Sequence, residues 1–185
     1  MTDTDAERNP MILSLFRKKA ASEPVYAVYN SIVAQSRRPV FYAQWGVPDT
    51  VTGRFDMISL HMALLFRRLR HGPEAAREFS QSVFDLFFKD MDRSLREMGV
   101  SDLGVPKKIQ KMGNIFFGLL AAMNEAMDRN DIDALAGVLA RNIFDGDDSP
   151  ELRALAGYIM ERDAELASQP VEAITGGVVR FEAAA

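Results

Sequence analysis

The chain of 185 residues contains no cysteine. This absence excludes disulfide bonds, thiol nucleophiles, thiolate zinc sites and iron–sulfur clusters, and it fits a reducing compartment. Histidine is scarce as well, because only His61 and His71 occur, about 15 Å apart along one predicted helix. They cannot share a metal ion, so we predict neither a metal site nor a cofactor. His61 lies among apolar residues, where a neutral, hydrogen-bonded core histidine is favoured over a ligand.

The sequence motifs of common enzyme classes are missing too. No serine lies in a GxSxG sequence, and neither GxxxxGK[ST] nor GxGxxG occurs, so nothing supports a nucleophile-elbow hydrolase, a P-loop protein or a Rossmann fold. The acidic turn at residues 145–148 lacks the glycine and the terminal glutamate of a calcium loop at the required spacing. We therefore do not predict an enzyme. Among the functional hypotheses, a small hydrolase built on the acid pairs of residues 90–97 ranks last.

No hydrophobic run is long enough to span a bilayer. Residues 55–66 are apolar almost all the way round a helix, but this run has about a dozen residues where a span needs roughly 20. The segment must be buried in protein, either as the central helix of a bundle or with one side flooring a groove that a partner covers. The formal net charge of -4 argues against a general nucleic-acid-binding protein, and we predict no DNA partner.

Periodic apolar residues and capping signals predict an all-α, single-domain bundle of about six helices with a central, largely buried apolar helix. Between the first and second helices, residues 39–54 hold prolines, glycines and aromatic residues, which predict a long loop with one short helical turn. No alternation of strand and helix patterns occurs, which argues against a parallel sheet. The predicted helices begin at Ser22, near residue 55, at Pro73, after Pro106, at Asp131 and at Ser149.

Three segments are expected along the chain. Residues 1–21 are predicted to be a flexible N-terminal arm, residues 22–168 the helical domain, and residues 169–185 a flexible tail with two glycines. Within the first segment, residues 11–19 read MILSLFRKK, which is not a signal peptide because its positive charges follow the apolar run. This short cationic segment either lies in a membrane interface, or is a frayed arm or one docked on the protein's own surface.

Positive charge gathers in clusters along the sequence. If the clusters meet in the fold, they form a basic surface able to contact anionic lipid or ribosomal RNA, and otherwise they are separate solvated charges. For a membrane or ribosome surface we select the second and third clusters. The clusters are Arg37 and Arg38, then Arg67, Arg68 and Arg70, then Lys107, Lys108 and Lys111.

Two long stretches carry a family resemblance. HMALLFRRLR, followed by FDLFFKDMDRSLREMGVSDLGVPKKIQKMGNIFFG, resembles the ubiquinol-cytochrome c chaperone family over roughly residues 24–165. Met123 stands where the family often has a tyrosine, a mild departure for the fold that concerns the contacts of that ring. The most specific residues are Phe88, Asp90, Met91, Asp92, Arg96, Glu97 and Gly99, with Lys107, Lys108 and Gly118 at the expected offsets.

The resemblance implies an all-α, non-enzymatic assembly factor for respiratory complex III that binds newly made cytochrome b. In mitochondrial members it also implies a small partner protein and the exit of the ribosomal tunnel. The first residues are acidic where a transit peptide would be rich in arginine, which indicates a bacterial-type member. The expected location is the cytoplasm, peripheral at the inner face of the cytoplasmic membrane.

A client made of apolar helices needs an apolar groove. The chain has 10 Met and 12 Phe, side chains that fill irregular cores and also line surfaces accepting varied partners. The third predicted helix has an apolar arc of roughly 200°, wider than one buried face requires. We hypothesise that Phe84, Phe87, Phe88, Met91, Met112 and Phe116 border the groove, with Asp90, Arg93, Arg96 and Glu97 at its rim.

A second hypothesis assigns the apolar excess wholly to the interior. The chain would then be a soluble helical scaffold or regulatory protein that binds another folded protein. Binding of an apolar dye by the native protein separates the two hypotheses, because an open groove binds the dye and a closed bundle does not.

Overall fold

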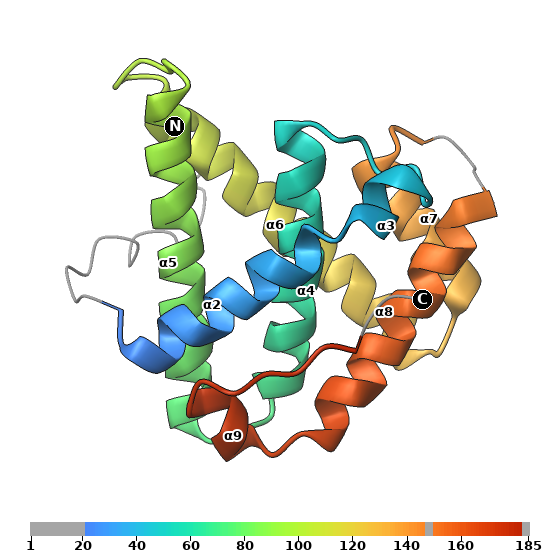
Figure 1. Cartoon of the computed structure of the whole chain (residues 1–185). Coiled ribbons are helices and arrows are strands. Elements are labelled where there is room, and N and C mark those ends of the chain that lie inside the picture. The colour runs from blue at the N-terminus through green and yellow to red at the C-terminus, as the bar shows by residue number, and fades with distance from the viewer. Residues whose placement is uncertain (1–20, 147–149, 183–185) are drawn as a thin grey trace, which may run out of the picture.

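The computed structural model describes residues 21–146 and 150–182, and it is helical throughout. Six helices of 12 to 24 residues and two helices of five residues make up these ranges, with no strand in them. The prediction of an all-α bundle is confirmed, and so is the short helical turn in residues 39–54. The helices are α2 (Glu23–Ser36), α3 (Pro39–Ala43), α4 (Val51–Leu69), α5 (Glu74–Glu97), α6 (Val105–Asp128), α7 (Ile132–Ile143), α8 (Pro150–Ser168) and α9 (Val171–Thr175) (Figure 1).

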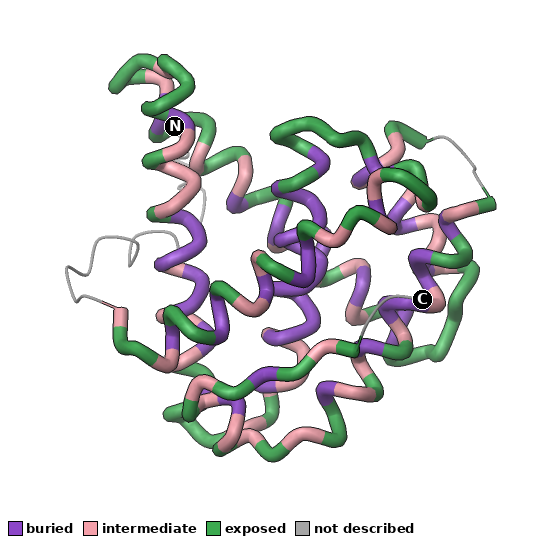
Figure 2. Tube along the Cα trace, in the orientation of Figure 1, coloured by how far each residue is buried: buried purple, intermediate pink, exposed green. Residues whose placement is uncertain are grey.

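Helix α4 is the centre of the core, as the sequence predicts. Every residue from Phe55 to Leu65 is buried, because α2, α5, α6, α7 and α8 all pack against this helix. Figure 2 shows it as a buried column in the middle of the molecule. Its N-terminus is fixed by Thr50, whose Oγ1 accepts a hydrogen bond from the Gly53 amide at 3.1 Å. Glycine is required at position 53, since a Cβ there would lie 2.0 Å from the Pro48 carbonyl oxygen.

Helices α5 and α6 are neighbours whose joined end projects past the rest of the bundle, at the upper left of Figure 1. Each has 24 residues, about 36 Å, against about 29 Å for the 19 residues of α4. Gly99, with φ +83°, ends α5, and the Val100 and Gly99 amides bond the Leu95 and Arg96 carbonyls at 3.0 and 2.9 Å. This αL ending reverses the chain toward α6. We call residues 89–112 the arm.

The segment after α8 corrects one expectation. A flexible tail was predicted from residue 169, but residues 169–182 lie along the bundle, with Ile174 fully buried and Val179 9% exposed. The side-chain amide of Gln169 pairs with the backbone of Arg180, donating at 2.9 Å and accepting at 2.9 Å. Two short apolar side chains and these backbone contacts hold the segment despite its glycines.

Two other expectations concern membranes. Residues 11–19 lie outside the described residues, so their predicted place at a membrane interface stays a prediction. Within residues 21–146 and 150–182, no helix has both the length and the hydropathy needed to cross a bilayer.

Candidate functional site

The four phenylalanines predicted to border a groove lie in the core instead. Phe84, Phe87, Phe88 and Phe116 are 0 to 3% exposed. The ring of Phe87 stacks on that of Phe55 with centroids 5.4 Å apart and an interplanar angle of 16°. The wide apolar arc of α5 has a plain cause, because α2, α4 and α6 each cover part of it. These rings therefore do not border an open groove in this structure.

The two methionines of the same prediction are placed differently. Met91 and Met112 are half-buried at the edge of the core, on the two helices of the arm. Beyond them the arm leaves Met98 51% exposed and Leu103 86% exposed, the highest value among the exposed large hydrophobic residues of the described chain. Figure 2 shows this projecting end as largely exposed or intermediate. The arm thus carries the most exposed large hydrophobic side chain of the described residues, while Val51 and Val178 are exposed elsewhere.

The charged residues predicted for the rim are on the arm, and they are paired. Asp90 accepts a hydrogen bond from the Tyr29 hydroxyl at 2.9 Å and forms an ion pair with Arg93. Arg96 forms ion pairs with Asp92 and Asp102. Burial and the nearby Asp90 carboxylate raise the pKa of Tyr29, so its hydroxyl remains a donor.

These ion pairs leave the arm's acids largely neutralised. Glu97 lies 3.9 Å from Arg93, and both side chains are about 70% exposed. Pairs this exposed contribute little to stability, roughly 0 to 1 kcal/mol. Their arrangement matters more for the surface potential of the arm than for its folding.

The two basic clusters selected from the sequence are far apart in the fold. Arg67, at the end of α4, bonds Asn124 and Asp128 in the last turns of α6. Lys107 begins α6, about 30 Å away along the helix axis. The two clusters therefore do not meet in the fold, because α4 ends beside the far end of α6, and the condition for one basic surface is not fulfilled.

The arginine cluster has a structural role. Arg67 also pairs with Asp163 of α8 at 3.1 Å, and Arg70 pairs with Asp128 at 2.9 Å. Arg68 donates to the carbonyls of Leu166 and Gln169 at 2.8 and 2.7 Å. These arginines join α4 to α6 and α8, whereas Lys107, Lys108 and Lys111 are exposed.

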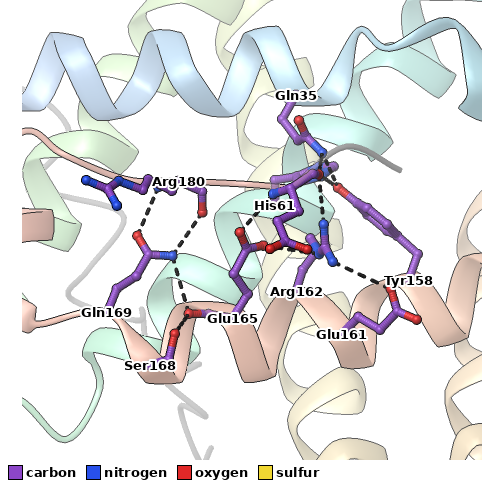
Figure 3. Close-up of polar contacts among 10 residues, drawn as sticks. Gln35, His61, Tyr158, Glu161, Arg162, Glu165, Ser168, Gln169 and Arg180 are labelled. Atoms are coloured by element: carbon purple, nitrogen blue, oxygen red, sulfur yellow. Dashed lines mark hydrogen bonds and ion pairs between the residues drawn. The ribbon is translucent and has the colours of Figure 1, made fainter. Parts of the chain in front are cut away.

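A hydrogen-bonded network lies in the core, on the side of the molecule away from the arm. His61 Nδ1 is 2.7 Å from the Met57 carbonyl, and Nε2 is 2.7 Å from the Tyr158 hydroxyl. Since a carbonyl only accepts, Nδ1 carries the proton and Nε2 accepts from Tyr158. The hydroxyl of Tyr158 accepts in turn from Gln35 Nε2 at 2.8 Å. Figure 3 shows these side chains converging between α2 and α8.

Burial fixes the protonation of this network. It lowers the pKa of His61 to about 4 and raises the pKa of Tyr158 to about 12. Both side chains are therefore neutral near pH 7, and the prediction of a neutral core histidine is confirmed. In this state the network can position helices, but it offers neither a charged base nor an activated nucleophile.

The C-terminal segment closes the network, a feature that the sequence reasoning missed. Arg162 donates to the Glu182 carbonyl at 2.7 Å and pairs with Glu165 at 3.2 Å. The ring of Phe181 meets that of His61 edge-on, with centroids 5.6 Å apart. One signal was available in the sequence, because Arg162 falls one turn after Tyr158 on the apolar stripe of this helix. In the structure Arg162 is only 5% exposed.

Comparisons with known proteins cover nearly all of this architecture. The model of the family described as Ubiquinol-cytochrome C chaperone matches residues 43–181, which include the whole arm. A Xenopus laevis protein named ubiquinol-cytochrome-c reductase complex assembly factor 1 is 21% identical over 137 residues, 73% of this chain and 68% of that protein. The crystal structure of the Cbp3 homolog from Brucella abortus is similar with a TM-score of 0.82 and 40% identity, covering 94% of this chain and 97% of that one.

Proposed function

Because the chain belongs to the ubiquinol-cytochrome C chaperone family, we propose that it is a non-enzymatic assembly chaperone for the cytochrome bc complex, with newly made cytochrome b as its client. The Xenopus relative supports the cytochrome bc complex as the target of assembly, since that protein is named a ubiquinol-cytochrome-c reductase complex assembly factor. The similarity at 40% identity to the Brucella protein supports a shared fold over almost the whole chain. The client is the finer part of the proposal and rests on the chemistry of the arm.

The observation that carries the proposal is the exposed apolar surface of the arm. A client built of apolar helices needs a partner that accepts apolar side chains of varied shape. Methionine suits this task, because it is unbranched, flexible and polarizable. Met91, Met98 and Met112 give the arm three of the chain's 10 methionines within 24 residues. They are only partly covered by the protein itself.

The client therefore lies against the apolar face of the arm, in a helix-on-helix arrangement. Val100, Leu103 and Ile109 extend this face between the methionines, and all three retain solvent exposure. The core phenylalanines support the face from beneath, since Phe88 and Phe116 are buried on the same two helices. Arg93 and Glu97, both largely exposed, lie beside the face and orient the client through its polar ends.

The place of action follows from the client. Cytochrome b is a membrane protein, so its chaperone works where the client enters the bilayer. We place the protein at the inner face of the cytoplasmic membrane as a peripheral protein. No described helix is suited to crossing the bilayer, so in the described part of the chain this contact is made from the membrane surface.

Affinity capture tests the proposal. A tag at the N-terminus keeps clear of the C-terminal segment that packs on Arg162. Protein recovered from gently solubilised membranes is examined by mass spectrometry and by haem absorbance. We expect cytochrome b to dominate, and the absorbance reports whether haem is already present. Recovery of soluble proteins alone, in cells making the complex and after cross-linking, contradicts the proposal.

A matched pair of variants localises the contact. Met98→Ser with Leu103→Ser removes the most exposed apolar side chains of the arm. Val51→Ser with Val178→Ser removes side chains of 61% and 51% exposure elsewhere. We expect the arm variant to reduce client recovery at least about ten-fold, since losing two buried apolar contacts costs more than about 1.4 kcal/mol. Equal losses in both variants contradict a role specific to the arm.

A further inference from the structure

Lysine is distributed unevenly along this chain. The chain has six lysines, and Lys89, Lys107, Lys108 and Lys111 all lie in the arm. With two arginines and four acids, the arm has a net charge of +2, whereas the whole chain carries -4. The arm is thus a basic projection on an otherwise acidic protein, and such a separation of charge directs binding to anionic surfaces.

The lysines of the arm are also left unpaired. Every ion pair between described residues is made by an arginine, and on the arm Arg93 and Arg96 pair with the four nearby acids. Lys107, Lys108 and Lys111 are exposed and form no ion pair or hydrogen bond with another described residue. Their positive charge is therefore available to a partner.

The position of these lysines on α6 does not serve folding. The first turn of α6 holds no acidic residue, and its N-cap Gly104 provides no side-chain cap. Lysines beside the positive end of a helix dipole disfavour the helix. At this end of α6, the charges of Lys107 and Lys108 add to the positive end of the helix dipole.

Apolar side chains accompany this potential at the tip. Leu103 is 86% exposed and lies four residues before Lys107, and Met98 is 51% exposed on the other side of the turn. The fold leaves these side chains at the end that projects farthest from the bundle (Figure 1). Exposed apolar side chains flanked by lysines are typical of segments that enter a membrane interface.

We propose that the tip of the arm docks on an anionic lipid bilayer. Leu103 and Met98 enter the interface between headgroups and acyl chains, where the same side chains meet the client as it enters the bilayer. Lys107, Lys108 and Lys111 contact lipid phosphates. The inference rests on the proposed function in that a chaperone for a membrane client needs such a contact, and it adds the surface that makes it. Lipid is favoured over RNA, because RNA phosphates satisfy the lysines but leave the exposed leucine in water.

Vesicle flotation of the full chain tests the electrostatic part. The vesicles contain phosphatidylglycerol and phosphatidylcholine in equal parts, with phosphatidylcholine alone as the neutral comparison. Each lysine near an anionic surface strengthens binding about five-fold, so we expect the triple variant Lys107→Gln, Lys108→Gln, Lys111→Gln to bind about 100-fold more weakly. Unchanged flotation of this variant overturns the proposal.

A second triple variant controls for net charge. Arg77→Gln, Arg141→Gln and Arg180→Gln remove the same charge from exposed residues outside the arm. Their side chains form no ion pair with described residues. We expect this variant to bind vesicles like the unaltered protein. An equal loss in both triple variants shows that only net charge matters, which overturns the assignment to the arm.

A single fluorescent label tests insertion, since the chain has no cysteine of its own. Leu103→Cys and Ala164→Cys, an exposed position on α8, are each labelled with an environment-sensitive dye. We expect a blue shift with anionic vesicles for the label at position 103 alone. If the protein floats while that label stays in water, another segment makes the contact and the proposal is wrong.

The remaining outcome concerns RNA. If the lysine variant loses RNA binding and keeps vesicle binding, the basic tip is an RNA surface and the lipid proposal is overturned. None of these assays contains cytochrome b. Failure here therefore leaves the proposed client untouched, and the capture experiment decides that question separately.

Discussion

The arm and the hydrogen-bonded network at His61 differ in which side chains they bury and which they leave in water. In the network, polar groups are buried, and His61, Tyr158 and Gln35 are hydrogen-bonded to one another through the Tyr158 hydroxyl. In the arm, apolar side chains such as Leu103 stay in water, and the lysines have no partner among the described residues. Folding explains the identity of the first set, since each member has a contact that its replacement would remove. Folding does not explain the second set, so we look there for function.

The largest expected effect on stability comes from a substitution in the core beside the arm. Phe87→Ala should lower the free energy of unfolding by about 3 to 5 kcal/mol, because a fully buried ring is removed and a cavity remains. Leu103→Ala should change it by less than about 0.5 kcal/mol. Chemical denaturation measures both. If the Phe87→Ala protein keeps its stability but binds the client more weakly, Phe87 belongs to the binding surface and not to the core.

The next effect concerns the network. Tyr158→Phe leaves His61 Nε2 without its donor and removes one of the two acceptors of Gln35 Nε2, which keeps the Glu182 carbonyl. The loss should cost about 1 to 3 kcal/mol. Tyr26→Phe is the matched control, since Tyr26 is 43% exposed and its hydroxyl bonds no described residue. Thermal unfolding of the two variants is compared. Equal melting temperatures would mean that the network adds nothing to stability.

The pH dependence of stability separates two buried groups on α4. The pKa of His61 falls from 6.5 to about 4 on burial, so the unfolded chain takes up a proton first and stability decreases as pH falls from 6.5 to 4. Asp56, buried and near Asp145, has a pKa raised from 3.8 to about 7. The folded chain then holds the extra proton, so stability decreases as pH rises from 3.8 to 7.

The two trends oppose each other, and Asp56→Asn removes one of them. We expect this variant to be about 1 to 2 kcal/mol more stable than the unaltered protein at pH 8, with the difference vanishing near pH 4. Denaturant titrations at a series of pH values give the curves. A variant that is less stable at pH 8 would show that the Asp56 carboxylate has a stabilising contact instead of a burial cost.

The smallest effect sharpens the contrast between folding and function. Lys107→Gln with Lys108→Gln should raise the free energy of unfolding by a few tenths of a kcal/mol, up to about 1, because two charges leave the positive end of α6. The same variant should bind anionic vesicles more weakly. Differential scanning fluorimetry and flotation measure the two effects. A loss of stability would give these lysines a structural role and weaken the case for the arm.

Much of the fold could be predicted from the sequence. Residues 55–65 are apolar on all sides, and only a central helix buries all sides of such a segment, which α4 does. The C-terminal segment could not be foreseen, because α9, which carries Ile174, packs against α2 and α5, helices far away in the sequence. Its glycines suggested looseness, and the contacts that overcome it are visible only in three dimensions.

The candidate site was predicted in part. The sequence shows that α5 has a wide apolar arc. It does not show whether part of this arc borders an open groove or is covered by another helix. In the structure α2 covers the part around Phe87. Met91 and Met112 lie at the edge of that core because α5 and α6 extend past α4. Helix lengths in the sequence hint at this overhang, but the direction of the helices decides it. The direction of α4 and α6 also decides why Arg67 and Lys107 lie far apart.

The most direct test of the account places a photoreactive amino acid at Met98 on the arm or at Ala164 on α8, in cells that make the cytochrome bc complex. Both positions are exposed, so either tolerates the larger side chain. The account predicts a cross-link to newly made cytochrome b from position 98 and none from position 164. Cross-linking to cytochrome b from α8 alone, or to soluble proteins alone from the arm, would contradict it.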